Sequence, residues 1–130
     1  MTRPRQDDAP GGLPRNYLRP CLLLLLAEGP SHGYELLEQI GRLGLERADP
    51  GGLYRSLRAM EQEGLVRSWW EHSQAGPARR TYALTDEGLE WLHAWAGSLR
   101  EVHRLLGSYL ERYESVTSIS LTETASLRTP

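Results

Sequence analysis

Residues 48–66 read "ADPGGLYRSLRAMEQEGLV", and this stretch decides the fold. Asp49 and Pro50 together predict the start of a helix. The Asp49 side chain can accept hydrogen bonds from free N–H groups of the first turn, and Pro50 lacks an N–H at a position where none would have a partner. The helix is predicted to end at Gly64. Its apolar residues recur at helical spacing and form an inner stripe of Leu53, Leu57 and Met60.

The opposite face of this helix has no core to cover, which raises the question of what it contacts. It carries Tyr54, Arg55 and Arg58. Arginines outnumber acids by five to three between residues 50 and 82, whereas acids outnumber arginines by six to three between residues 86 and 114. The net charge of −2 therefore hides a basic middle and an acidic C-terminal part.

Two helices are predicted before this stretch. The first contains the apolar run Cys21–Ala27 and stops at Gly29 and Pro30, because both residues break helices. Ser31 is predicted to cap the second helix. The apolar positions of that helix recur at helical spacing and are Tyr34, Leu37, Ile40 and Leu43.

A β-hairpin and a last helix are predicted after the third helix. The segments Leu65–His72 and Arg79–Leu84 are predicted strands, because they contain β-formers and flank the turn-rich sequence "SQAGPA". Trp69 and Trp70 are adjacent and point to opposite faces, and we expect Trp70 to pack under the hairpin. The last helix begins after Thr85, with acids in its first turn.

Three helices followed by a hairpin are the elements of a winged helix-turn-helix, so the predicted fold class is mainly α with a small β-hairpin. In this fold the third helix lies in the DNA major groove, and the wing reaches a neighbouring backbone or the minor groove. Residues 16–84 then form the DNA-binding domain, and residues 85–114 form a long C-terminal dimerisation helix. The polar segments 1–15 and 115–130 are predicted to be a flexible arm and a flexible tail.

Glycines and arginines at particular positions fit this interpretation. Gly51 and Gly52 cost the third helix up to about 1 kcal/mol each in propensity. They also leave room where phosphates approach the helix N-terminus. Arg79 and Arg80 stand beside a Gly-Pro turn, where no core requires them, and DNA phosphate is the partner that we infer.

The last helix predicts a homodimer. Its apolar seam has spacings of 3, 4, 3 and 4, close to a heptad, and a helix with such a seam needs a partner. The seam consists of Leu99, Val102, Leu106, Tyr109 and Tyr113. Trp91 and Trp95, with Leu99 nearby, have two interpretations: they fill a core, or they line a pocket for a planar aromatic effector at the dimer centre.

Other classes of function find little support in the sequence. The histidines fall in different elements, and no metal-ligand spacing, nucleophile elbow, phosphate loop or dinucleotide fingerprint is present. We therefore expect no metal, no cofactor and no enzyme activity. The longest apolar run is far below the roughly 20 residues that cross a bilayer, and we expect a cytoplasmic protein with no membrane contact.

Four ordered motifs resemble the PadR-like transcriptional regulators over residues 18–114. They are "HGYELLEQI", "PGGLYRSLRAMEQEGLV", "SWWE" and "GPARRTYALTDEG". The resemblance implies a dimer built by the first and last helices, which places Leu22 and Leu25 at the interface. It also implies a repressor that leaves its operator when an effector arrives, in the subgroup with one C-terminal helix.

Three positions depart from the pattern of that family. Asp49 and Gly52 stand where relatives often carry a hydroxyl residue, so one hydroxyl contact to DNA is missing. Asp49 also brings a negative charge near the phosphates. Thr81 stands where an aromatic residue is common, whereas Arg79, Arg80 and Tyr82 fit.

The predicted partner is a double-stranded operator with an inverted repeat, because a dimer presents two third helices to successive major grooves. The candidate contacts are His32, Tyr34, Gly51, Gly52, Tyr54, Arg55, Arg58, Arg79 and Arg80. Two alternatives stay open: the arginine-bearing face is only a solvated surface, or the domain binds another protein instead of DNA. His32 bonds either a phosphate or its own turn.

Overall fold

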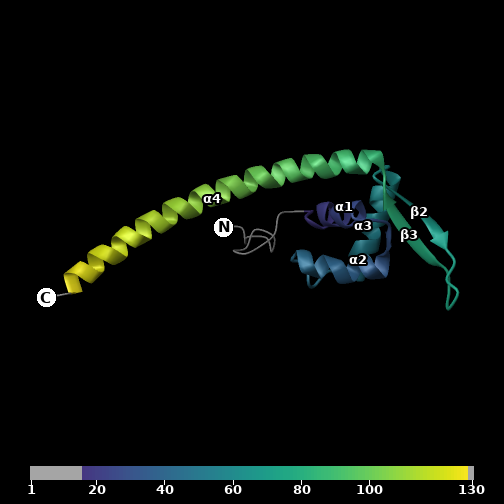
Figure 1. Ribbon diagram of the computed structural model, residues 1–130, viewed down its shortest axis with the longest axis horizontal. Helices are drawn as coiled ribbons and strands as arrows, with labels where there is room; N and C mark the ends of the chain where they lie inside the picture. The colour runs from purple at the N-terminus through teal and green to yellow at the C-terminus, as the bar shows by residue number, and fades with distance from the viewer. Residues whose placement is uncertain (1–15, 129–130) are drawn as a thin grey trace, which may run out of the picture. The chain divides into compact units, whose positions relative to one another are not determined.

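The computed structural model describes residues 16–128 of a chain that divides into two compact units, Met1–Ala94 and Trp95–Pro130. The first unit holds three helices and a small sheet, and the second consists of the continuation of the last helix (Figure 1). The elements are α1 (Leu18–Ala27), β1 (Ser31–His32), α2 (Gly33–Ile40), the 3-10 helix η2 (Gly41–Leu43), α3 (Pro50–Gln62), β2 (Val66–Glu71), β3 (Arg79–Leu84) and α4 (Asp86–Arg128).

The sheet has three antiparallel strands in the order β1-β3-β2. Strands β2 and β3 with their connecting turn form the predicted hairpin, residues 66–84, which is called the wing below. The sequence did not predict β1, because two residues are too few to show an alternating pattern. Its pairs Ser31 with Tyr82 and His32 with Thr81 join the start of α2 to the wing.

The core of the first unit lies between α1, α2, α3 and the sheet. Its fully buried side chains are Leu22, Leu23, Leu36, Ile40, Leu53, Leu57 and Met60. Leu22 is 0% exposed and Leu25 is 8% exposed, so their surface is covered without a partner chain. This corrects their assignment to a dimer interface: α1 is apolar on most of its circumference and is buried on most sides. Leu24, at 42%, is its exposed leucine.

Helix α2 differs from its prediction in its cap and in its buried face. Its N-cap is His32, not Ser31, and the imidazole Nδ1 accepts a hydrogen bond from the Glu35 N–H. The face toward the core carries Leu36 and Ile40. Tyr34 lies two residues, about 200° of helix, from Leu36, so its side chain is exposed and does not join the predicted inner stripe.

Helix α3 confirms its predicted start and its buried stripe. Asp49 is the N-cap and Pro50 stands at the first helical position. The helix ends at Gln62, and Gly64 has a φ of 81°, a left-handed conformation that glycine adopts at little cost. The side chains that it buries are those predicted, Leu53, Leu57 and Met60.

The first turn of α4 packs on the end of α3 and the start of β2. The Thr85 hydroxyl donates to the Gly64 carbonyl at 2.6 Å and accepts from the Gly88 N–H at 3.0 Å. Gly88 has no room for a side chain, since a Cβ there would lie 2.0 Å from the carbonyl oxygen of Leu65. The helix start after Thr85 is therefore as predicted, and a hydroxyl cap and a close backbone contact fix it.

Helix α4 continues past Glu114 to Arg128, where the sequence predicted a flexible tail from residue 115. No glycine or proline interrupts residues 115–128, so nothing in their composition breaks the helix. The predicted arm, residues 1–15, lies outside the described residues.

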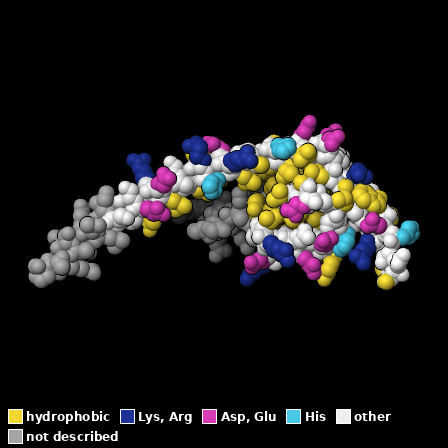
Figure 2. Space-filling view, in the orientation of Figure 1, with side chains coloured by type: hydrophobic (Ala, Val, Ile, Leu, Met, Phe, Trp, Pro, Cys, Tyr) yellow, Lys and Arg dark blue, Asp and Glu magenta, His cyan; other side chains and the backbone are white. Residues whose placement is uncertain are grey.

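The second unit exposes a row of large apolar side chains. The seam residues Val102, Leu106, Tyr109 and Tyr113 are exposed, while Leu99 is half-buried. Val116 extends the spacing by three more residues and is also exposed. Figure 2 shows hydrophobic side chains at the surface of this helix, with charged side chains interspersed. The described part of α4 therefore has an apolar face wide enough to pack against another helix.

Candidate nucleic-acid interface

The N-terminus of α3 is capped by its own carboxylate. Asp49 Oδ1 accepts from the Gly51 N–H at 3.3 Å, and Oδ2 accepts from the Gly52 N–H at 3.1 Å. Asp49 Oδ2 also lies 3.6 Å from Arg55 Nη2. These two N–H groups are therefore already bonded, and Asp49 occupies the position where the sequence led us to expect a phosphate. A Cβ on Gly52 would lie 3.7 Å from Asp49 Oδ2, an ordinary contact, so this carboxylate does not require a glycine there.

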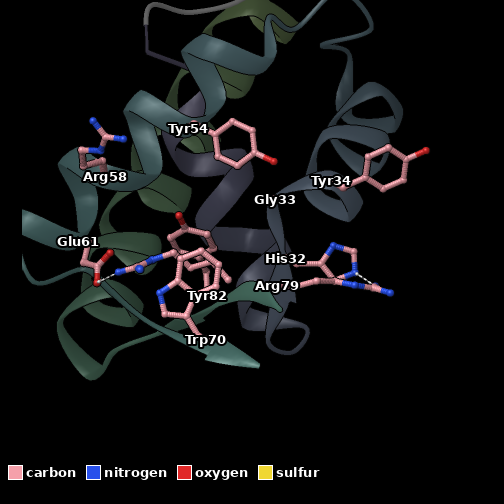
Figure 3. Close-up of a pocket in the computed structure, with 10 residues that line it drawn as sticks. His32, Gly33, Tyr34, Tyr54, Arg58, Glu61, Trp70, Arg79 and Tyr82 are labelled. Atoms are coloured by element: carbon pink, nitrogen blue, oxygen red, sulfur yellow. Dashed lines mark hydrogen bonds and ion pairs between the residues drawn. The ribbon is translucent and has the colours of Figure 1, made fainter. Parts of the chain in front are cut away.

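Tyr54 lies on the outer face of α3 and packs over the start of α2. A Cβ on Gly33 would lie 2.4 Å from Tyr54 Cε1, so only a glycine admits the ring in this position. Figure 3 shows the Tyr54 ring directed toward Gly33. The contact joins α2 and α3 on the face that carries the candidate contacts.

The pairing of β1 with β3 brings His32 next to Arg79. His32 Nε2 lies 3.2 Å from Arg79 Nη1 and 3.7 Å from Glu35 Oε2. The imidazole therefore bonds its own turn, which was one of the two interpretations of the sequence, and it also stands beside the exposed guanidinium of the wing.

Arg80 has a different environment from its neighbour. Its Nε donates to Ser68 Oγ at 2.9 Å, and the Ser68 hydroxyl lies 2.7 and 2.9 Å from the two carboxylate oxygens of Glu61. Arg80 Nη2 also lies 3.7 Å from Glu61 Oε2, and its guanidinium stacks 5.4 Å from the centre of the Trp70 ring. Arg80 thus joins the wing to α3 within the chain.

A groove of about 670 Å³ runs between the start of α2, the outer face of α3 and the wing (Figure 3). It brings together six of the predicted contacts and four further residues. The predicted ones are His32, Tyr34, Tyr54, Arg58, Arg79 and Arg80, and the others are Gly33, Glu61, Trp70 and Tyr82. Gly51, Gly52 and Arg55 do not line it.

Trp70 is a groove residue that the sequence did not predict. The expectation that it packs under the hairpin is wrong, because its side chain is 62% exposed and lines the groove. Strand alternation places Trp69 and Trp70 on opposite faces but does not say which face is covered. Trp69 is the half-buried member of the pair.

Tyr82 contributes a buried phenol to the groove lining. Burial raises the pKa of its hydroxyl, and the nearby Arg80 guanidinium opposes this shift. The hydroxyl therefore stays protonated at neutral pH, and the side chain offers a neutral donor beside the charged ones.

Comparison with known proteins shows the family of the chain. The model of the transcriptional regulator PadR-like family matches residues 22–94. The chain belongs to the PadR-like family. The Escherichia coli transcriptional regulator YqjI is 32% identical over 77 residues, which are 58% of this chain and 35% of that protein. The chain spans about a quarter to a third of the length of the curated relatives it matches.

Solved structures of PadR proteins share the fold. A PadR family transcription regulator from Clostridium difficile has a TM-score of 0.66 and 27% identity, over 73% of this chain and 99% of that one. Bacillus subtilis PadR in complex with operator DNA has a TM-score of 0.56 and 27% identity, over 61% of this chain and 46% of that one. The family recognised from the four sequence motifs is thus confirmed.

The effector residues predicted for this PadR-like protein are not among the groove residues. Trp91 is 52% exposed in the first unit, and Trp95 and Leu99 are half-buried in the second. None of the three lines the groove. Their role in binding an effector stays a prediction.

Residues 16–128 contain neither a membrane-spanning helix nor a metal-binding cluster. No helix among these residues is long and apolar enough to cross a bilayer. No cluster of three or more His, Cys, Asp or Glu side chains among them is suited to hold a metal ion. Cys21 is buried, and burial raises the pKa of its thiol, so it is a neutral core side chain at neutral pH.

Proposed function

We propose that this PadR-like protein is a homodimeric DNA-binding repressor that a small-molecule effector releases from its operator. The observation that carries the proposal is the groove, where the outer face of α3 and the wing present Arg58, Arg79 and exposed aromatic rings on one surface. Bacillus subtilis PadR, which shares the fold, was solved in complex with operator DNA.

The charges on this surface favour DNA as the partner. Neither Arg58 nor Arg79 has an acidic partner among the residues that the structure describes. Guanidinium groups of this kind neutralise phosphates, and they release counterions when they do so. Arg80 stabilises the packing of the wing on α3, because its partners Glu61, Ser68 and Trp70 belong to the same chain.

The exposed face of α4 supports the homodimer. A row of leucine, valine and tyrosine side chains with heptad spacing is costly to leave in water. A second copy of α4 carries the same apolar row and can pack against it. Two copies present two α3 helices. The operator is then an inverted repeat whose half-sites lie about one helical turn, or a multiple, apart.

A mobility-shift and footprinting experiment with the DNA upstream of the protein's own gene tests this function. We expect a symmetric footprint with two protected half-sites. Protection of one asymmetric half-site by a monomer contradicts the dimeric operator. No shift at low salt with any DNA, together with capture of a protein partner on the same surface, supports the protein-interaction module instead.

A further inference from the structure

Arg55 lies on the face of α3 that points away from the core. It is two residues from both Leu53 and Leu57, about 200° of helix from each. Its side chain is 75% exposed. Side chains of a helix lean toward its N-terminus, so the guanidinium reaches back over the turn that contains Gly51. A Cβ on Gly51 would lie 3.1 Å from Arg55 Nη1, so the guanidinium lies on a helix turn that has no side chain at that position.

Asp49 holds the charged end of this side chain. Its two carboxylate oxygens accept from the Gly51 and Gly52 N–H groups, which fixes the orientation of the carboxylate. Asp49 Oδ2 lies 3.6 Å from Arg55 Nη2 and forms an ion pair with it. An exposed ion pair contributes little to stability, so the main effect of this one is on the position of the guanidinium. The backbone of α3 therefore orients Asp49, and Asp49 orients Arg55.

The pairing with Asp49 makes Arg55 a poor partner for phosphate. Phosphate binding depends on net positive charge, because it releases counterions from the DNA, and the Asp49 carboxylate offsets the charge of Arg55. Arg58 is exposed on the same helix and has no acidic partner among the described residues, so its charge is not offset. A paired guanidinium still has a flat shape and several N–H donors, which suit the edge of a base.

Guanine offers the acceptors that fit such a side chain. In the major groove guanine presents O6 and N7 side by side, and an arginine bonds both at once. Adenine and thymine present one acceptor each, and cytosine presents a donor. In helix-turn-helix proteins the N-terminal residues of the recognition helix contact the base edges. The Arg55 guanidinium lies over this part of α3.

We propose that Arg55 reads one guanine in each operator half-site and that Asp49 is the residue that positions it. The assignment rests on the proposed DNA-binding function, and it gives sequence reading and phosphate binding to different arginines. Arg55 determines which operator is bound, whereas Arg58 and Arg79 bind DNA of any sequence through its phosphates. Asp49 weakens binding to all DNA by its charge, but it increases the difference in affinity between sequences.

Fluorescence anisotropy with the footprinted operator tests this assignment. In one half-site each G·C pair is replaced in turn by A·T, and the readout is the ratio of the Kd for the replaced DNA to the Kd for the operator. For the parent protein we expect a G·C pair whose replacement raises the Kd roughly 5- to 150-fold, the range for one bidentate arginine contact. Replacing that guanine by 7-deazaguanine, which lacks the N7 acceptor, should also raise the Kd.

Two arginine variants of α3 separate base reading from phosphate binding. Arg55→Ala should lower the ratio at that G·C pair to about one and change the slope of log affinity against log salt little. Arg58→Ala is the matched control: it should keep the ratio and reduce the slope by about 0.9 for each phosphate contact that is lost. An unchanged ratio in Arg55→Ala overturns the guanine contact, and a reduced slope in that variant then assigns Arg55 to a phosphate.

Variants around Arg55 test how it is positioned. Asp49→Asn keeps a capping oxygen and removes the charge, so it should keep the stability of α3 and lower the ratio. The relief of charge repulsion is common to both DNAs and cancels in the ratio. Gly51→Ala places a methyl group against Arg55 Nη1 and should also lower the ratio, whereas Gly52→Ala meets Nη2 at 3.7 Å, an ordinary contact, and should keep it. A full ratio in both Asp49→Asn and Gly51→Ala overturns the positioning role.

The parent protein alone separates failure of this assignment from failure of the proposed function. A parent that binds no DNA even at low salt contradicts the DNA-binding function itself. A parent that binds a symmetric operator, with the same Kd after every G·C replacement, keeps that function and overturns the reading of guanine by Arg55.

Discussion

Arg79 and Arg80 are adjacent in the sequence, yet strand alternation gives them opposite surroundings. Arg80 is held by Ser68 and Glu61, and its guanidinium covers Trp70, whereas Arg79 is exposed beside His32. A guanidinium that is already bonded within the chain gains less from a phosphate than one in water. We therefore expect different roles for the two arginines: Arg80 holds the wing to α3, and Arg79 contacts DNA.

The salt dependence of DNA binding tests this difference. Arg79→Ala should reduce the slope of log affinity against log salt by about 0.9 for each phosphate contact that is lost, and a dimer loses two. Arg80→Ala should leave the slope nearly unchanged and instead lower the unfolding midpoint. Fluorescence anisotropy at several salt concentrations measures the slope, and equal slopes for the two variants contradict the assignment.

Asp49 sets the local charge at the N-terminus of α3, the end that we propose to face DNA. Asp49→Ser keeps an oxygen that caps the helix but removes the negative charge, so we expect tighter binding to DNA of any sequence at nearly unchanged stability. Asp49→Ala should cost about 0.5–2 kcal/mol in the free energy of unfolding. Denaturant unfolding and anisotropy measure the two effects, and weaker DNA binding by Asp49→Ser contradicts the repulsion.

The residue roles were predictable where they depend on local spacing. Asp49 and Pro50 signal a helix start within a few residues, so the cap of α3 followed from the sequence. The bonds of Arg80 join positions 61, 68 and 80, and only the folded chain brings those together. The exposure of Trp70 likewise depends on which side of the wing other elements cover.

Elements were easier to predict than their ends and partners. The long periodic stripe of α3 and the paired strands of the wing were predicted, because hydrophobic periodicity is a strong signal. The two-residue strand β1 shows no period of its own. The predicted buried face of α2 included Tyr34, whereas the structure buries Leu36. In a helix of only eight residues, either residue fits an apolar pattern.

Two glycines of α4 test how its first turn is fixed. Gly88→Ala places a methyl group against the Leu65 carbonyl, and we expect it to cost about 1–3 kcal/mol by analogy with overpacked cores. Gly97→Ala in the same helix meets nothing within 4 Å, and it should be neutral or stabilising by up to about 1 kcal/mol. Denaturant midpoints of both variants give the comparison. A destabilising Gly97→Ala with a neutral Gly88→Ala refutes the close contact.

The whole molecule depends on two copies if the exposed face of α4 is the subunit contact. The first unit presents one α3 and one wing, so a single copy reaches only one half-site of an inverted repeat. The sequence predicted the heptad seam, and Val116 extends it beyond the predicted end of the helix. The assignment of Leu22 and Leu25 to the interface failed because sequence similarity does not show how much of α1 the chain itself covers.

Substitution of one seam residue tests the dimer. Leu106→Asp puts an unpaired carboxylate into an apolar contact, which should cost several kcal/mol, roughly the penalty for an uncompensated buried polar group, and split the dimer. Ser108→Asp adds the same charge on the opposite side of α4 and should stay dimeric. Analytical ultracentrifugation measures both masses. A dimeric Leu106→Asp protein rules out this seam, and a monomeric one should also lose its operator.

The carboxylate that caps α3 has a consequence for how the protein searches a genome. Because Asp49 already bonds the first N–H groups of the helix, the first turn is ordered before any DNA arrives. The turn then need not fold each time the protein binds a DNA site, so binding does not pay the conformational entropy of ordering it. A protein that slides or hops between non-specific sites can compare successive base steps with a preformed reading surface. We expect fast association, with differences between operators appearing mainly in the dissociation rate.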